Sequence, residues 1–139
     1  MAQSFDLVVT NDNEGLAQAG MAVASFLEPQ SLTPKTEYAM TLSLEEMLTN
    51  VIKYAYDDDQ QHNINISVHV GDTEAVMQLT DNGHEFNPLA EPEPDLDQSI
   101  EDRPIGGLGL HLVRSMTQRV EYERRDSQNT LTMYFSIRE

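Results

Sequence analysis

Three polar side chains of complementary chemistry recur at helical spacing in the segment LEEMLTNVIKYAY, residues 44–56. Glu46, Asn50 and Lys53 are four and then three residues apart, so they share one face of a predicted helix. An amide oxygen can bind Mg²⁺, an ammonium group can offset phosphate charge, and a carboxylate can act as a general base. The trio therefore suits a metal–phosphate site. A solvated helix face is the alternative, although asparagine is unfavourable inside a helix.

The same segment has an apolar stripe at the helical period, formed by Leu44, Leu48, Val51 and Ala55. The polar trio begins two residues after the stripe, about 200° around the helix axis. We therefore expect the stripe to pack on the core and the trio to lie on the face away from it.

Two further segments could bind a ligand. Asp81-Asn82-Gly83 ends a predicted strand, and such a tripeptide is most often a turn. Gly106-Gly107-Leu108-Gly109-Leu110 precedes a predicted helix, where glycines let backbone N–H groups and the helix dipole approach an anion. The glycine spacing is not that of a dinucleotide-binding or Walker loop. Each of these signals is weak alone.

The elements that would position these residues can be read from periodicity and from capping residues. Predicted helices begin at Asp12 or Asn13, at Thr33-Pro34 and after the glycine-rich segment, and predicted strands span 5–9, 64–70, 75–80, 120–124 and 131–137. Tight turns between strands favour antiparallel pairing, and helices at this frequency can all cover one face of a sheet. We expect one domain, residues 1–139, with the architecture of a two-layer α/β sandwich.

The stretch between the second and third segments is different in kind. Residues 87–104 contain four prolines and little periodicity, and six acidic residues fall between Glu91 and Asp102. A loop of this length inside a compact domain is usually functional or disordered.

Composition restricts the classes of function. The chain has 139 residues, no cysteine and a formal net charge of −16. Such charge disfavours direct binding to nucleic acid or to an anionic membrane, but it is compatible with a basic protein partner. No apolar run approaches the ~18 residues of a membrane span, and the N-terminus does not resemble a signal peptide. We expect a cytoplasmic protein without disulfides.

In this order, with a long loop before the third, the three segments resemble the N, G1 and G2 boxes of the GHKL ATP-binding superfamily. The resemblance covers nearly the whole chain and implies the Bergerat-type fold, a mostly antiparallel mixed sheet covered on one face by about three helices. Within the superfamily, the D-x-G-x-x-F-x-P pattern and GGLGLHLVRSMTQRVEYER are most similar to the small anti-sigma factor serine kinases of bacteria.

The resemblance implies a role for each matching residue. Glu46 would be the general base acting on a substrate serine, Asn50 the Mg²⁺ ligand, and Lys53 a basic group near the phosphates. Asp81 would bind the adenine amino group, and Gly83 would give the ring room. Residues 87–105 would form a lid over the nucleotide. The implied nucleotide-binding set is completed by Arg103, Gly106, Gly107, Leu108, Gly109 and Leu110.

The sequence departs from the superfamily pattern at two places. Glu85 stands where a second glycine is common, although the serine-kinase branch tolerates this, and Arg103 is the only cation in an acidic lid. Acidic groups near a triphosphate are repulsive unless they point outward or a metal ion offsets them.

The implied function is an ATP-dependent protein serine/threonine kinase that acts as an anti-sigma regulatory factor by partner switching. Its implied cofactors are ATP and Mg²⁺, and its implied partners are an anti-sigma-factor antagonist as substrate, a sigma factor or other regulatory target, and a second copy in a homodimer. The alternative is a non-catalytic, nucleotide-sensing module that sequesters a regulatory partner. A gyrase-type ATPase is disfavoured, because those enzymes need a further domain to use hydrolysis.

Overall fold

The computed structural model describes residues 2–90 and 107–137. Predicted residues of the lid from 91 to 105, Arg103 among them, therefore lie outside the described residues, as does Gly106. The elements of the described chain, in order, are β1 (Gln3–Thr10), α1 (Asn13–Leu27), the 3₁₀ helix η1 (Glu28–Gln30), α2 (Pro34–Tyr54), β2 (Asn63–Val70), β3 (Glu74–Asp81), the 3₁₀ helix η2 (Pro88–Ala90), α3 (Gly107–Met116), β4 (Arg119–Arg125) and β5 (Gln128–Ser136).

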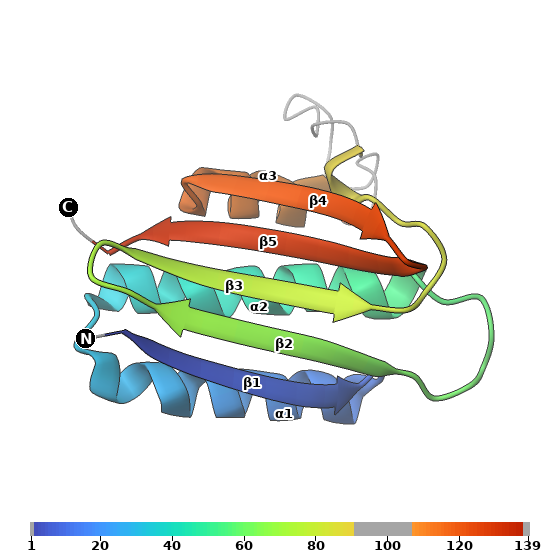
Figure 1. The fold of residues 1–139 in the computed structure, drawn as a ribbon, viewed down its shortest axis with the longest axis horizontal. Coiled ribbons are helices and arrows are strands. Elements are labelled where there is room, and N and C mark those ends of the chain that lie inside the picture. The colour runs from blue at the N-terminus through green and yellow to red at the C-terminus, as the bar shows by residue number, and fades with distance from the viewer. Residues whose placement is uncertain (1, 91–106, 138–139) are drawn as a thin grey trace.

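The strands form one sheet in the order β1-β2-β3-β5-β4. All four pairings among the described strands are antiparallel, so the sheet lacks the parallel pair that a mixed sheet would contain. The three α-helices lie together on one face, and the other face is open (Figure 1). The predicted two-layer sandwich of the Bergerat type is confirmed.

Local sequence signals explain where the first two α-helices begin. The Asp12 side chain caps α1 by accepting a hydrogen bond from the Gly15 backbone N–H at 2.8 Å. Thr33 caps α2 in the same way through Thr36, and Pro34 occupies the first turn, where its missing N–H costs nothing. Both starts match the predicted capping residues. Among the described residues, no helix is long and apolar enough to span a membrane.

The core lies between the sheet and the helices. Alternate residues of each inner strand face it, as the strict alternation of β2 and β5 predicts. The largest fully buried side chains include Phe135, Leu27, Met40, Leu44, Leu48, Ile64 and Ile66. The apolar stripe of α2 is therefore confirmed as core.

The polar trio of α2 does not lie on the face away from the core, and this expectation was wrong. Asn50 is only 9% exposed, Glu46 is half-buried, and Lys53 alone is exposed. The cause is that α2 lies between α1 and α3, which both pack on it (Figure 1). Periodicity identifies the stripe on the sheet, but it does not show a second helix covering the flank.

The β4–β5 hairpin turns through Asp126 and Ser127, whose φ angles are 54° and 63°. Positive φ at both central residues gives the twist that suits a tight hairpin. In the neighbouring pair of strands, Asp81 of β3 lies opposite Asn129 of β5, which comes just after this turn in the chain. This register positions one end of the site described next.

Candidate functional site

The first and third predicted segments meet where α3 crosses α2. A Cβ atom added to Gly109 would collide with the Glu46 carboxylate oxygen Oε2 and would lie 3.2 Å from its Cδ. Without a side chain at Gly109, the first turn of α3 can lie directly against this carboxylate. The structure thus brings the candidate general base and the glycine-rich helix start together, from positions 63 residues apart in the chain.

Asn50 lies one turn further along α2 from Glu46. Its Nδ2 donates a hydrogen bond to the Glu46 backbone carbonyl at 3.0 Å. A carbonyl oxygen only accepts, so the amide must turn its nitrogen toward the helix and its oxygen the other way. An amide oxygen held outward in this manner is a suitable ligand for a hard cation such as Mg²⁺.

Asp81, at the end of β3, is a carboxylate buried to 4% exposure. Burial raises its pKa, and hydrogen bonds from Asn129 and Gly83 act in the opposite direction by favouring the ionised form. Both of these bonds, at 2.9 Å each, reach the same oxygen, Oδ1. The group is therefore held by one oxygen, which leaves Oδ2 as the atom suited to accept a bond from a ligand N–H.

Asn129 is the centre of a hydrogen-bond network beneath Asp81. Its Nδ2 donates to Asp81 and to the His84 carbonyl oxygen, at 2.9 and 2.8 Å. Its Oδ1 accepts from the Phe86 N–H, from the Tyr122 hydroxyl and from Arg124 Nη1. A buried amide satisfied at both ends in this way holds the carboxylate and the loop after β3 in one arrangement.

Arg124 connects this network to the backbone of the same loop. Its Nη1 also donates to the Gly83 carbonyl at 2.8 Å. Sequence reasoning missed Asn129, Tyr122 and Arg124, which it assigned to a hairpin and its turn. The signal was present, because Asn129 is the polar residue at an inward position in the alternation of Leu131, Met133 and Phe135.

Gly83 lies against the C-terminal end of α2. A Cβ atom there would collide with the Ala55 carbonyl oxygen and would lie 2.8 Å from its carbon. The His84 N–H donates to that same carbonyl at 2.9 Å, and Phe86 packs on Tyr54 with ring centroids 5.8 Å apart. This close approach to α2 is enough to require glycine, whatever else the position does.

Tyr56 adds an unsatisfied polar atom beside Asp81. Its hydroxyl is buried without a hydrogen-bond partner among the described residues. Burial, and then the negative charge of Asp81, raise the pKa of this phenol above its usual value. The ring stacks on His62 at a centroid distance of 4.5 Å. A neutral phenol of this kind can donate a hydrogen bond to a ligand atom that reaches it.

The remaining predicted site residues are placed less favourably. Leu110 is 4% exposed and belongs to the core, and Lys53 is exposed at the surface. Gly107 and Leu108 form the first residues of α3. Arg103 and Gly106 are outside the described residues.

The family model for the histidine kinase-like ATPase domain matches residues 9–135, which is most of the chain. The chain belongs to this family. The match includes both helices that meet at Glu46 and the strand that ends at Asp81. An ATPase domain implies ATP as its ligand, so the residues gathered here are the candidate ATP site of the domain.

Several curated relatives of this ATPase domain carry regulatory names. A serine/threonine-protein kinase, BtrW, of Bordetella bronchiseptica is 29% identical over 99 residues, covering 71% of this chain and 70% of the relative. An anti-sigma F factor of Clostridium botulinum is 28% identical over 127 residues, covering 91% and 87%. A serine-protein kinase, RsbW, of Halalkalibacterium halodurans is 25% identical over 135 residues, covering 94% and 82%.

Solved structures agree with the fold of the ATPase domain. The RsbU and RsbW domains of a Mycobacterium tuberculosis protein superpose with a TM-score of 0.69 at 10% identity, covering 96% of this chain and 32% of that one. The histidine kinase AdeS of Acinetobacter baumannii superposes with a TM-score of 0.51 at 13% identity, covering 99% and 70%. At these identities the likeness concerns the fold alone.

The described side chains of this ATPase domain offer a single ligand group for a Mg²⁺ ion that binds together with ATP. Among the described residues, no group of three His, Asp or Glu side chains could hold a metal by itself. Mg²⁺ usually keeps several waters and is bound by one or two protein groups together with substrate phosphates. Asn50, with its oxygen directed away from the helix, is the group that fits this role.

Proposed function

We propose that this protein is an ATP-dependent protein serine/threonine kinase that acts as an anti-sigma regulatory factor by partner switching. The observation that carries the proposal is the contact between Glu46 and Gly109, which places a half-buried carboxylate at the start of the glycine-rich helix α3. A domain that only bound nucleotide would need no carboxylate at that position. The names of the curated relatives support the same class of activity.

In this proposal each end of the site has its own task. Asp81 accepts a hydrogen bond from the adenine amino group through Oδ2, and the Asn129 network holds it in place. Backbone N–H groups at the start of α3 face the phosphates, where the helix dipole favours negative charge. Asn50 holds Mg²⁺, which supplies charge neutralisation on the phosphates.

Glu46 then acts on the substrate. Its carboxylate accepts the proton of a serine or threonine hydroxyl as that oxygen attacks the γ-phosphorus of ATP, and ADP leaves with the electrons of the broken bond. The expected protein substrate is an anti-sigma-factor antagonist, and a sigma factor or similar regulator is the other partner. A homodimer and a cytoplasmic location complete the proposal.

The test is phosphotransfer by the Glu46→Gln variant. Candidate antagonists encoded beside the gene of this protein are incubated with protein and Mg-ATP, and phosphoserine is measured by mass spectrometry. A general base contributes roughly 10²- to 10⁴-fold to rate, so the variant should lose at least about a hundredfold. ATP binding should remain within about threefold, because the amide keeps the size of the carboxylate it replaces.

A Glu74→Gln variant is the matched control, since β3 begins at Glu74 and ends at Asp81, so that Glu74 lies far from the candidate site. It should transfer phosphate at the wild-type rate. If the wild-type protein binds ATP but phosphorylates no cognate antagonist, the kinase proposal is wrong. The protein would then be a nucleotide-sensing module that sequesters its partner, which the name of the anti-sigma F relative also fits.

A further inference from the structure

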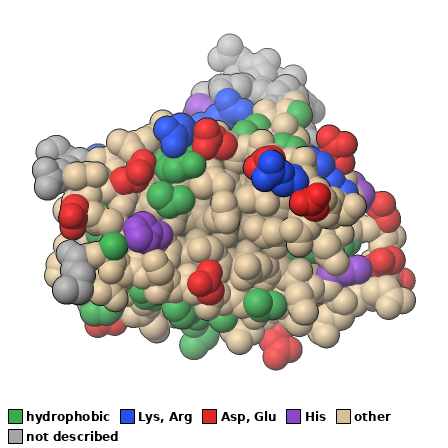
Figure 2. Space-filling view, in the orientation of Figure 1, with side chains coloured by type: hydrophobic (Ala, Val, Ile, Leu, Met, Phe, Trp, Pro, Cys, Tyr) green, Lys and Arg blue, Asp and Glu red, His purple; other side chains and the backbone are tan. Residues whose placement is uncertain are grey.

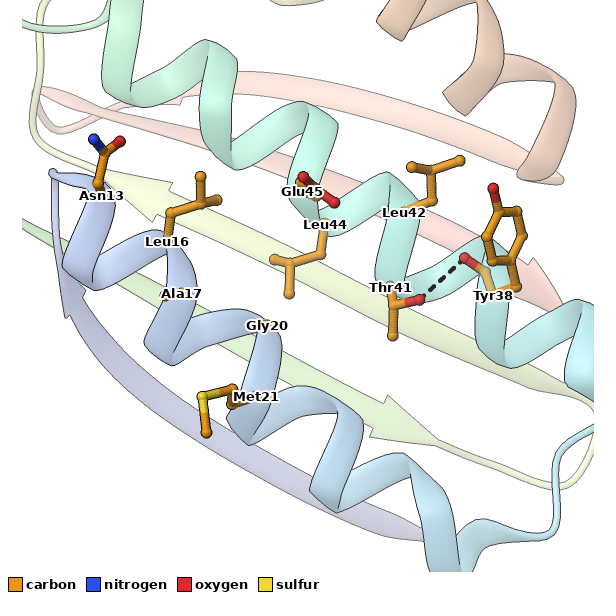
Figure 3. A pocket seen from close by; sticks show the side chains of 10 residues that line it. All are labelled: Asn13, Leu16, Ala17, Gly20, Met21, Tyr38, Thr41, Leu42, Leu44 and Glu45. Carbon is orange, nitrogen blue, oxygen red and sulfur yellow. Dashed lines mark hydrogen bonds between the residues drawn. The ribbon is translucent and has the colours of Figure 1, made fainter.

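The outer surface of the helical layer contains a groove between α1 and α2, on the opposite side of α2 from α3 (Figure 3). Its volume is about 610 Å³. The residues that define this α1–α2 groove are Leu16, Gly20 and Met21 from α1, and Tyr38, Leu44 and Glu45 from α2. Leu16 and Leu44 point into the space between the helices and form an apolar floor.

Two large apolar side chains on the walls of the groove are exposed to solvent. Met21 is 74% exposed and Tyr38 is 61% exposed, the two highest values among the large hydrophobic residues of the described chain. They come from different helices and line the same groove. Scattered apolar residues are normal on a surface, but two in one concave site mark a place for a partner.

Gly20 leaves the groove open at its middle. A Cβ atom added to this glycine would meet nothing within 4 Å, so the groove is not closed by the neighbouring chain. Glycine costs about 0.5–1 kcal/mol in a helix relative to alanine. No packing contact inside the domain explains its presence in α1, whereas a partner lying close to the helix would.

The charge around the groove is almost entirely negative. Helix α1 contains no lysine or arginine, and neither do β1, β2 and β3. Glu45 lines the groove, and Glu14 and Glu37 lie in the first turns of the two helices. Lys35, two residues before Glu37, is the basic residue closest in the sequence to the residues that line the groove. The four described arginines lie instead on α3 and β4, and Figure 2 shows basic side chains in the half of the open sheet face over β4.

We propose that the α1–α2 groove binds an amphipathic helix of a partner protein, with its apolar face in the groove and lysine or arginine residues on its flanks. The apolar floor accepts the apolar face, as in other helix-in-groove complexes. The acidic surroundings attract the basic flanks and set the specificity. This inference rests on the proposed function only in that it names the chemistry of a regulatory partner.

A second copy of the same chain fits the groove poorly. Symmetric association through these helices would bring Glu14, Glu37 and Glu45 of one molecule against the same residues of another. Each molecule also carries a formal net charge of −16. Like charges across an interface cost free energy, so the homodimer we propose would use another surface.

The test uses two fluorescent 18-residue helical peptides with the same leucine face. One carries lysine on its polar face and the other carries glutamate. Binding to the full-length protein is measured by fluorescence anisotropy, and chemical-shift changes locate the site. We expect the lysine peptide to shift the resonances of Ala17, Gly20 and Thr41, and to bind at least tenfold more tightly than the glutamate peptide.

Four variants make the test specific to the groove. Gly20→Phe fills the open space and should weaken the lysine peptide at least tenfold, while Gly20→Ala should change its affinity by less than twofold. Glu45→Lys should weaken it by a similar factor to Gly20→Phe. Asp6→Lys, on exposed strand β1, makes the same charge change away from the groove and should have little effect.

Four results would overturn the inference. These are equal binding of the two peptides, an unchanged affinity in Gly20→Phe, an equal loss in Asp6→Lys, or chemical-shift changes confined to other surfaces. Loss of a dimer in Gly20→Phe, seen by sedimentation, would also overturn it by making a second copy the occupant. Because the groove and Glu46 lie on opposite flanks of α2, ATP binding should be unchanged in all these variants, which separates failure here from failure of the kinase proposal.

Discussion

Asp81 and Asn129 show how one side chain can determine the chemistry of another. Burial of the Asp81 carboxyl raises its pKa, and the Asn129 amide partly offsets this by hydrogen bonding to the ionised form. An ionised carboxylate accepts hydrogen bonds only, so it can accept from the amino group of adenine. Protonation of Asp81 would remove that acceptor. ATP affinity should therefore fall as pH decreases through the raised pKa.

The Asn129→Ala variant tests this coupling. Without the amide bond the pKa of Asp81 should rise further, so the acid limb of ATP affinity should move to higher pH. A hydrogen bond to a charged group contributes about 1.5–3 kcal/mol, so affinity at neutral pH should fall at least about tenfold. Calorimetric titration with ATP at a series of pH values measures both effects.

The control for this prediction is Asn65→Ala, at an exposed position of β2. Its affinity and pH profile should match the wild type. Thermal unfolding of both variants identifies the pH range in which each is folded. If Asn129→Ala weakens binding equally at every pH, the residue supports the loop structurally and does not tune Asp81.

The sequence predicted single residues with uneven success, for physical reasons. Glu46, Asn50 and Asp81 were singled out because their types are unusual for their positions. In the structure Asn50 and Asp81 are buried and Glu46 is half-buried, and their roles stay predictions. Leu110 was included by proximity to the glycines, yet its apolar side chain is in the core. Asn129 was missed because the turn motif beside it explained its polarity without a contact 48 residues away.

At the scale of elements, the crossing of α2 and α3 determines the candidate site. The two helices approach closely because Gly109 has no side chain where it meets Glu46. Periodicity predicted both helices but not their crossing, since Glu46 and Gly109 are 63 residues apart in the chain, with β2 and β3 between them. The same crossing explains why the polar trio is partly buried.

The Gly109→Ala variant tests the importance of this crossing. The added Cβ meets the end of a flexible carboxylate side chain, so the domain should still fold while Glu46 is displaced. A misplacement of this kind can cost about 10²-fold in rate, so phosphotransfer should fall much further than ATP affinity. Single-turnover phosphotransfer and calorimetry on the same preparation measure the two quantities.

The matched control is Gly20→Ala, a second helical glycine that has open space beside it. It should keep full phosphotransfer and raise the free energy of unfolding by about 0.5–1 kcal/mol. Full phosphotransfer in Gly109→Ala would show that close helix contact does not position the carboxylate.

At the scale of the whole molecule, alternation and turn signals were enough to predict the sandwich. Strands β2, β3 and β5 bury one face, so their patterns are strong, and short connections restrict the topology to antiparallel neighbours. The order β1-β2-β3-β5-β4 includes one non-sequential neighbour pair, because α3 and β4 come between β3 and β5 in the chain. The alternation of buried residues alone does not predict that β5 lies between β3 and β4 in the sheet.

The charge of the molecule is also distributed by element. Acidic residues surround the α1–α2 groove, whereas the described arginines lie on α3 and β4. A nucleotide that carries several negative charges must therefore bind through local groups rather than through the overall field. We therefore expect ATP affinity to depend on the proposed Mg²⁺ ligand Asn50 and on the start of α3.

The most direct test of the central claim is calorimetric titration of ATP into the wild-type protein and the Asn50→Ala variant, each with and without Mg²⁺. We expect the wild type to bind ATP with an affinity that depends on Mg²⁺. The affinity of the variant should be at least about tenfold lower, which corresponds to a loss of about 1.4 kcal/mol in binding free energy. The variant should also lose the difference between the two conditions. Mg²⁺-dependent binding that is equal in both proteins, or no binding at millimolar ATP, would contradict the account.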